Sequence, residues 1–329
     1  MKDKIERGAQ IVIKDWMKIR SNDKLLIVTN EKYMLEATLL KKYALQRNAS
    51  VDLMIVENAG RKAGVLFDEN ETLFDGYTDI IGATDYSIVT TKAAKRAIKR
   101  GNIFLSLPLH VNNNKSMLSY DFMIMDTKKS KLMAEVIMKY ICNSSMLQIT
   151  TDIGTDVKVY KRDRMPGFFN GVAKDGNGFS SASFEIYVPI EETETEGEMI
   201  VDGSLGYIGK PSEPVRIKFS KGRIIEIENS LGGDKLKKYI NEYNDSSMYV
   251  ASEFGIGLNS YAKCEGNCYI EDESTYGTFH IGFGRNIALG GNHEANGHFD
   301  LVSLKPDIYA DNRKIMHQGR IIIPEPQVY

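Results

Sequence analysis

The sequence predicts an α/β protein with two domains: a mostly parallel sheet with flanking helices over residues 1–145, and a β-rich, metal-binding domain over residues 146–329. Two observations predict the first domain: apolar runs such as 25–29 and 103–109 have no polar face, and helical periodicity separates them. Strands that are buried on both faces and separated by helices are typical of parallel sheets. After about residue 146, short alternating runs replace the helical pattern, which indicates an antiparallel or mixed sheet.

The first domain is expected to alternate helices and strands along the chain. Polar residues 21–23 break the first helical pattern before the first apolar run, as a turn does. In chain order, the expected elements are a helix over 3–19, a strand over 25–29, a helix over 32–47, strands over 51–56 and 87–91, a basic helix over 91–101, a strand over 103–109, and a closing helix over 128–142.

The second domain is expected to contain mainly short strands. Alternating runs predict strands over 156–160, 184–190, 198–203 and 215–228, and the one clear helical pattern there covers 234–243. The acidic run EETETEGE at 191–198 is interpreted as a solvated hairpin or loop.

Composition excludes several classes of function. A net charge of -2 gives no electrostatic reason to expect nucleic acid or an anionic membrane as a partner. No apolar run approaches the roughly 18–20 residues that cross a bilayer, and MKDKIERGAQ lacks the apolar core of a signal peptide. Three cysteines do not make a disulfide framework. We therefore expect a cytoplasmic protein.

Candidate metal ligands lie on four predicted strands of the second domain. In YGTFHIGFG, bulky residues alternate with small ones, so His280 projects from the face that is not core. In HFDLV, His298 and Asp300 share one face, and Glu185 and Glu253 lie on the corresponding faces of FEIYV and YVASEF. Each of these residues, taken alone, would more often have a structural role than bind a metal. Their shared placement predicts a site for a metal that takes nitrogen and oxygen ligands.

Other features have less specific interpretations. GFGRNIALGG resembles a phosphate-binding loop, but no helical pattern follows it and no Lys-Ser/Thr pair is present, so its glycines more simply let the backbone pass close to the site. Cys264 and Cys268 have no second Cys or His pair at finger spacing, which favours free thiols over zinc ligands. His110 ends an apolar strand, where a structural role is favoured over a ligand contact.

The segment SEFGIGLNSYAKCEGNCYIEDESTYGTFHIGFG, followed by NHEANGHFDLV, resembles the catalytic half of the aminopeptidase T (M29-type) metallopeptidases. Their pattern is E-x-G-I-G-x-N, then G-T-x-H-I-A-x-G, then H-x-D, and the resemblance covers residues 183–325. It implies a homodimeric metalloaminopeptidase that acts on peptides or related small molecules and binds two divalent ions (Zn, Co or Mn). The implied ligands are Glu185, Glu253, His280, His298 and Asp300, and the implied catalytic residues are Glu185 and Glu253.

An alternative comes from the same superfamily. Shorter relatives are similar to 2,5-dihydroxypyridine 5,6-dioxygenase, a mononuclear non-haem iron enzyme, and two histidines with one carboxylate satisfy its facial ligand pattern. Ile287, which stands where the aminopeptidases often have tyrosine, favours this alternative. Retention of both Glu185 and Glu253 favours the peptidase, because a site for one metal has no need of two additional carboxylates. The sequence leaves both hypotheses open.

Overall fold

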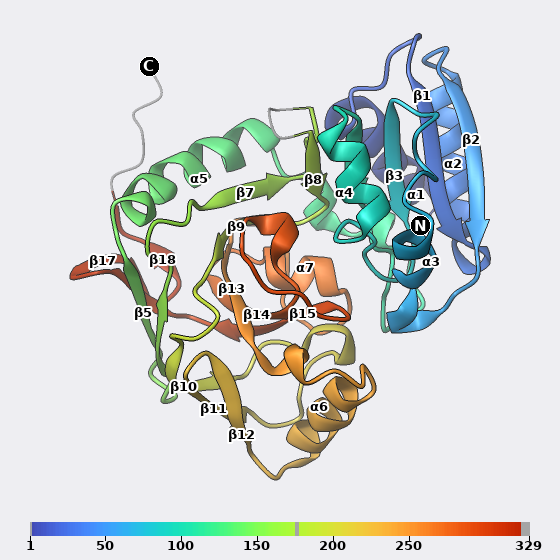
Figure 1. Ribbon diagram of the computed structural model, residues 1–329. Coiled ribbons are helices and arrows are strands. Elements are labelled where there is room, and N and C mark those ends of the chain that lie inside the picture. Colours follow the sequence, from blue (N-terminus) through green and yellow to red (C-terminus); the bar gives the residue numbers. More distant parts are fainter. Residues whose placement is uncertain (1, 175–177, 324–329) are drawn as a thin grey trace. The chain divides into compact units, whose positions relative to one another are not determined.

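The computed structural model describes residues 2–174 and 178–323, and the last two positions of the stretch 183–325 lie outside them. The chain divides into two compact units, residues 1–127 with 169–183, and residues 128–168 with 184–329 (Figure 1). This division differs from the predicted boundary near residue 146. Helix α5 (Thr127–Cys142), expected to close the first domain, falls almost wholly in the second unit. The chain then returns to the first unit, where the three-residue strand β8 (Phe179–Ser181) pairs with the first sheet.

The first unit contains the alternating helices and strands that the periodicity predicts. Its strands are β1 (Lys24–Asn30), β2 (Ser50–Val56), β3 (Asp79–Ala83), β4 (Ile103–Ser106) and β8. Its helices are α1 (Lys2–Ile11), continued by the π-helical η1 (Val12–Trp16), and α2 (Met34–Leu45), α3 (Val65–Glu69) and α4 (Lys92–Lys99). Short 3-10 helices are η2 (Glu31–Tyr33), η3 (Gly60–Lys62), η4 (Met117–Ser119) and η5 (Asp121–Ile124).

The strands of this unit form one parallel sheet in the order β2-β1-β3-β4-β8. Side chains from the sheet and its helices form one core cluster: Leu26, Val28, Phe67, Phe74, Ile80, Ile88, Ala93, Ala94, Ala97 and Phe104. The α/β fold class with a mostly parallel first sheet is therefore confirmed.

The expected strand over 87–91 is wrong. That stretch is a turn leading into α4, where the Thr91 side chain caps the helix by accepting a hydrogen bond from the Ala94 amide. Ile88 is fully buried in the core, which explains why the run looks like a strand in the sequence. The strand that precedes α4 and lies between β1 and β4 in the sheet is β3, whose five residues are all buried.

The second unit is rich in antiparallel strands, as predicted. Its strands are β5 (Met146–Thr150), β6 (Asp156–Tyr160), β7 (Gly167–Asn170, which reaches into the first unit), β9 (Phe184–Pro189), β10 (Glu196–Val201), β11 (Val215–Ser220), β12 (Arg223–Ile227), β13 (Ala251–Gly257), β14 (Thr278–Gly284), β15 (His298–Leu304), β16 (Asp307–Ala310), β17 (Arg313–His317) and β18 (Arg320–Ile321). Its helices are α5, α6 (Leu231–Asn241) and α7 (Tyr269–Ser274), with 3-10 helices η6 (Gly206–Ile208), η7 (Ser246–Tyr249) and η8 (Ile287–Leu289).

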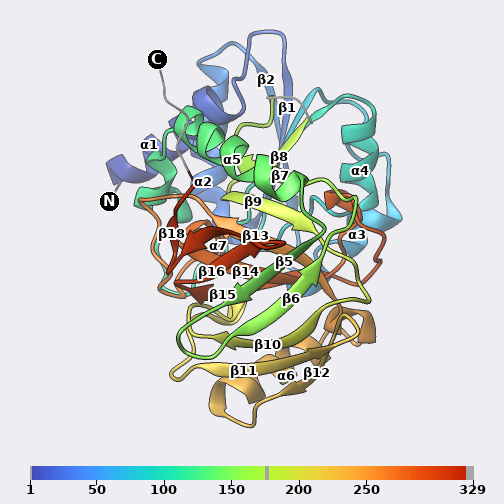
Figure 2. The same cartoon turned by 90° about the vertical axis from the view of Figure 1, so that its left-hand side faces the viewer.

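These strands form two sheets. The larger has the order β12-β11-β10-β6-β5-β16-β17-β18, and Figure 2 shows β5, β6, β10 and β11 side by side. The smaller has the order β15-β14-β13-β9-β7. Phe283 of β14 stacks on Phe219 of β11 with ring centroids 6.0 Å apart and on Phe299 of β15 at 5.2 Å. One face of the small sheet is thus packed against the large sheet, which leaves its opposite face for polar side chains.

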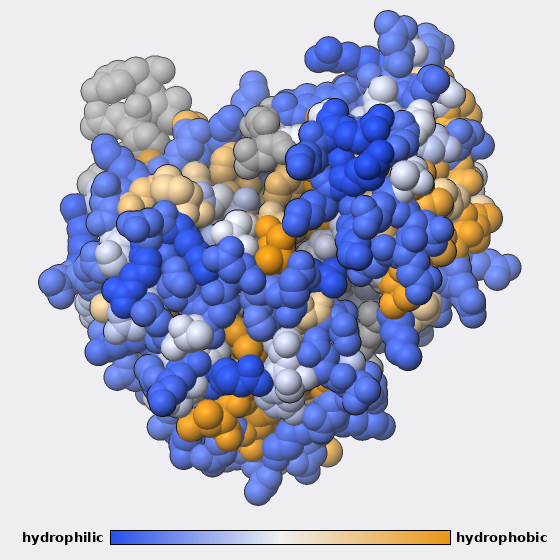
Figure 3. Space-filling model, in the orientation of Figure 1, coloured by the Kyte–Doolittle hydropathy of each residue, from blue (hydrophilic) through white to orange (hydrophobic). Residues whose placement is uncertain are grey.

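No helix in the described part of the chain has the length and apolar character needed to span a bilayer. The face drawn in Figure 3 is mostly hydrophilic, and apolar residues appear on it in separate small areas. Isolated apolar residues of this kind are normal on protein surfaces.

Candidate metal centre

The five predicted ligands come from four neighbouring strands of the small sheet. Strand β9 carries Glu185, β13 carries Glu253, β14 carries His280, and β15 carries His298 and Asp300. The structure brings them into two overlapping groups, Glu185–Glu253–His280 and Glu253–His298–Asp300. Within each group, one ligand atom per residue lies within 4.8 Å of the others. Glu253 belongs to both groups, so it lies between two potential ion positions.

The spacing of the donor atoms fits first-row divalent ions. Tetrahedral ligands at about 2.1 Å from zinc are roughly 3.4 Å from one another. The Nε2 atom of His280 is 3.0 Å from a Glu185 oxygen, and the Nε2 atom of His298 is 2.9 Å from Glu253 and 3.2 Å from Asp300. Among the described residues, the buried Oδ1 atom of Asp300, which faces the Nε2 atom of His298, has no hydrogen bond of normal geometry. The donor set therefore suits a metal ion better than a hydrogen-bonded core.

A glycine makes room for the His280 ring. Gly255 of β13 is the register partner of His280 on β14. A Cβ atom at Gly255 would lie 1.8 Å from Nε2 of that ring, far inside any van der Waals contact. The glycine in the E-x-G segment is therefore required by the His280 ring beside it.

A β-bulge directs Glu253 toward the two groups. The register of β13 with β14 shifts between Ala251 and Glu253, so Ser252 is the extra residue. Bulges change the direction of a side chain and are frequent beside active sites. The regular alternation expected from Tyr249 to Glu253 is wrong at this point, because Tyr249 ends η7 and the strand begins at Ala251.

A backbone carbonyl fixes the orientation of His298. The Nδ1 atom of its ring is 2.9 Å from the carbonyl oxygen of Arg285. A carbonyl only accepts, so Nδ1 carries a proton in this contact. When the ring is neutral, its lone pair is then on Nε2, the atom that faces Glu253 and Asp300.

The five predicted ligands carry more negative charge than the positive groups around them compensate. Burial, opposed by His298 and reinforced by Asp300 and Glu185, raises the pKa of Glu253 to about 7. Burial disfavours protonated His280, but Glu185 and the other carboxylates outweigh it and raise its pKa to about 9. Burial also opposes ionisation of Asp300, yet His298 and His280 hold its pKa at about 2. Without metal, protons supply the missing positive charge, and metal binding would displace them.

Glu273 is a site residue that the sequence reasoning missed. It lies on α7 and is buried beside the ligands, where burial followed by the charges of Glu185 and Asp300 raises its pKa well above the usual range. Tyr269, on the same helix, donates a hydrogen bond to Asp300 and stacks on Tyr207 with ring centroids 4.1 Å apart. The available signal was the acidic run in YIEDES, inside the segment that carries the family resemblance.

The remaining candidates lie outside both groups. Cys264 and Cys268 are free thiols, and burial raises the pKa of Cys268 well above its usual range. His110 is in the first unit, where its Nδ1 atom is 3.3 Å from an oxygen of Asp85. Ile287 begins η8, in the loop between β14 and β15.

Comparisons with known proteins agree with this architecture. Residues 110–323 match the sequence model of the family described as 2,5-dihydroxypyridine 5,6-dioxygenase (NicX). A curated enzyme of that name from Pseudomonas putida is 27% identical over 148 residues, which is 41% of this chain and 41% of the relative. That alignment therefore covers less than half of the relative's length.

Two solved structures share the fold. The structure of the 2,5-dihydroxypyridine dioxygenase from Pseudomonas putida superposes with a TM-score of 0.80 at 16% identity, covering 99% of both chains. Wild-type AmpT from Thermus thermophilus superposes with a TM-score of 0.65 at 13% identity, covering 98% of this chain and 100% of that one. At such low identity, these similarities establish the fold alone.

Proposed function

The chain belongs to the 2,5-dihydroxypyridine 5,6-dioxygenase (NicX) family, and within it we propose a dinuclear metal-dependent hydrolase that removes N-terminal residues from peptides. Family membership supports an enzyme, and the fold that the chain shares with the aminopeptidase AmpT is compatible with a hydrolase. The observation that carries the proposal is the pair of ligand groups sharing Glu253. A carboxylate common to two ligand sets is what a bridged pair of ions requires.

The charge of the site supports two ions. Four buried carboxylates, those of Glu185, Glu253, Glu273 and Asp300, surround the two imidazoles. One divalent ion would compensate half of this charge when the histidines are neutral. Two would compensate all of it, and uncompensated buried charge is strongly unfavourable.

The residues of the site have distinct roles in this proposal. Two bound divalent ions supply a water of lowered pKa and a Lewis acid for the substrate carbonyl. Glu185 with His280 would hold one ion, His298 with Asp300 would hold the other, and Glu253 would contribute to both. Burial and the charges of Glu185 and Asp300 raise the pKa of Glu273, which favours its protonated form while few positive charges lie nearby. The side chain of His298 is 17% exposed whereas that of His280 is 1% exposed, so substrate would approach from the His298 side.

Peptide substrates with free and blocked N-termini test the proposed reaction. The metal-loaded protein is expected to release the first residue of a free peptide and to leave its N-acetylated counterpart intact. His298→Ala should abolish this release. Release from both peptides, or from neither, would contradict an aminopeptidase.

The second candidate function is a mononuclear iron ring-cleaving dioxygenase. The family match and the curated relative favour it. It would use His280, His298 and Asp300 as the two-histidine, one-carboxylate set. In this structure, however, the two histidines fall into different ligand groups. Oxygen consumption with 2,5-dihydroxypyridine by the Fe(II)-loaded protein, together with no peptide release, would establish this candidate in place of the first.

A further inference from the structure

The acidic run over 191–198, expected to be a solvated hairpin or loop, contains one carboxylate that is mostly withdrawn from solvent, that of Glu192. Arg164 lies between two of its carboxylates, with Nη2 2.7 Å from a Glu192 oxygen and Nε 3.2 Å from a Glu191 oxygen. The side chains of Arg164 and Glu192 are only 11% and 15% exposed. Burial disfavours ionisation of Glu192, but Arg164 and the amide donors around it lower its pKa to about 2. Arg164 and Glu192 therefore form an ionised pair whose side chains are held in one arrangement.

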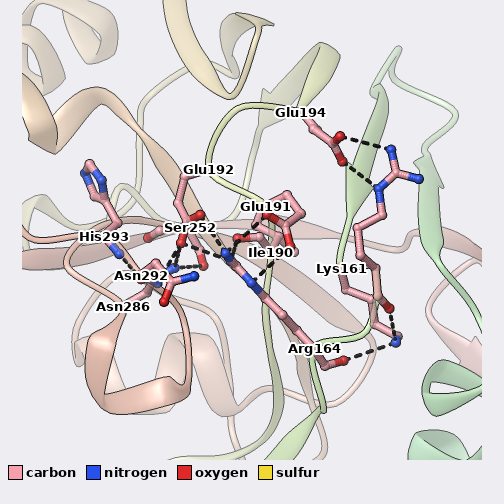
Figure 4. Close-up of polar contacts among 11 residues, drawn as sticks. Lys161, Arg164, Ile190, Glu191, Glu192, Glu194, Ser252, Asn286, Asn292 and His293 are labelled. Atoms are coloured by element: carbon pink, nitrogen blue, oxygen red, sulfur yellow. Dashed lines mark hydrogen bonds and ion pairs between the residues drawn. The ribbon is translucent and has the colours of Figure 1, made fainter.

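Glu192 also binds the loop between β14 and β15 by hydrogen bonds, so the ion pair with Arg164 holds this loop in place. One of its oxygens accepts hydrogen bonds from the Asn286 amide at 2.8 Å and from the backbone N–H of Asn292 at 3.0 Å (Figure 4). The loop also packs on itself around this point. A Cβ atom at Gly291 would lie 2.1 Å from Nδ2 of Asn286, so only glycine permits this approach.

Asn286 connects the loop to the bulge that precedes Glu253. Its Nδ2 atom also donates to the Ser252 carbonyl at 2.9 Å, and its Oδ1 atom accepts from the His293 backbone N–H at 2.9 Å. The side chain is fully buried. Both of its amide hydrogens and its oxygen are thereby used, which leaves it one orientation.

The same loop positions His298. Arg285, the neighbour of Asn286, donates its backbone N–H to Gly297 at 2.8 Å and accepts from Nδ1 of His298 at 2.9 Å. Displacement of Asn286 would shift the carbonyl that orients the His298 ring. The loop therefore reaches two ligands of the Glu253–His298–Asp300 group, His298 through Arg285 and Glu253 through Ser252, whereas the other group shares only Glu253 with it.

We propose that Arg164, Glu192 and Asn286 are positioning residues for the Glu253–His298–Asp300 group, and that they affect this group more strongly than the other. The proposal rests on the dinuclear site proposed above. Residues that orient metal ligands through hydrogen bonds commonly change metal affinity by 10- to 100-fold when they are removed. Here the effect should be larger for the ion of this group, because both Glu253 and His298 would be displaced there and only Glu253 in the other group.

The test compares Glu192→Ala with a matched control in the same acidic run. Glu194 makes a similar two-contact ion pair with Arg162, at 2.9 Å for each contact, but it does not contact the β14–β15 loop in the described hydrogen bonds. Metal-free protein would be titrated calorimetrically with Zn²⁺ at constant pH. In Glu192→Ala, we expect one of two binding steps to weaken by about 10- to 100-fold. The other step should weaken less, and both steps in Glu194→Ala should stay within about threefold.

A second readout follows the His298 ring directly. Proton–nitrogen NMR of the metal-free protein should show the Nδ1–H of His298 as a hydrogen-bonded, slowly exchanging proton in the wild type and in Glu194→Ala, and as a faster-exchanging one in Glu192→Ala. Asn286→Asp provides a nearly isosteric variant, because it keeps the acceptor for His293 but places an oxygen opposite the Ser252 carbonyl. It should give the same unequal loss if Glu192→Ala fails to fold.

Three results would overturn the proposal: equal weakening of both steps, an unchanged His298 signal in both Glu192→Ala and Asn286→Asp, or the same changes in Glu194→Ala. A wild type that binds a single ion would contradict the dinuclear function instead. The positioning role would then be judged on the affinity of that ion and on the His298 signal.

Discussion

Gly255→Ala tests whether the glycine beside His280 is required by the metal site. A Cβ atom there would lie 1.8 Å from Nε2 and 2.1 Å from Cε1 of the His280 ring, whereas ordinary contact begins at 3.4 Å. The ring would have to move by about 1.6 Å. Binding and catalytic groups must be held within about 0.5 Å, and a 1 Å displacement can cost about 100-fold in rate. We expect loss of the ion held by the Glu185–Glu253–His280 group and at least a ~100-fold lower kcat/KM.

The assay combines metal analysis with far-ultraviolet circular dichroism and peptide release. Gly76→Ala is the matched control, because a Cβ atom at Gly76 would meet nothing within 4 Å and its φ is not positive. It should keep full metal content and activity. If Gly255→Ala also keeps both, His280 does not occupy a ligand position and the assignment of this group is wrong.

Further substitutions and a pH change separate ligand chemistry from packing. His298→Ala should abolish activity and leave the midpoint of thermal unfolding nearly unchanged. Phe299→Ala removes a fully buried ring and should lower the free energy of unfolding by about 3–5 kcal/mol. A Phe299→Ala protein that is stable but binds no metal would show that the core face and the ligand face of this strand are assigned the wrong way round. The Glu192 carboxyl has a folded pKa of about 2 against an ordinary 4.5, so its contribution of about 3 kcal/mol is present above pH 4.5 and declines as pH falls toward 2. Urea unfolding at pH 5 and pH 3 should show this decline in the wild type and a smaller one in Glu192→Gln. Replacing Cys264 and Cys268 together by Ser should leave metal content and activity within about threefold, and loss of metal would make the thiols ligands.

The sequence predicts the small sheet well because only one of its faces is apolar. Alternation in β14 places Phe279, Ile281 and Phe283 in the core and His280 opposite them, and all three apolar residues are fully buried. The two-residue period of a strand is local, so it can be recognised without knowing the partner strand. The bulge at Ser252 depends on how β13 pairs with β14, and no local pattern indicates it.

The roles of Glu192 and Glu273 were not predicted because their burial depends on residues far away in the sequence. Glu192 and Glu273 both occur in acidic runs, which are usually solvated. Glu192 is held by Arg164, which lies 28 residues earlier in the chain, and Glu273 is buried because α7 places it among other carboxylates. The unit boundary was missed for a similar reason. β8 joins the first sheet through only three residues, too few to show a period.

The number of metal ions per chain tests the central claim most directly. Protein purified without oxygen, stripped of metal and reloaded with Zn²⁺, Mn²⁺ or Fe²⁺, would be analysed by elemental mass spectrometry against protein concentration. The shared position of Glu253 predicts two ions per chain, falling to one in His298→Ala. A wild-type value of one, held as iron and lost completely in His298→Ala, would contradict the dinuclear site and support the ring-cleaving dioxygenase.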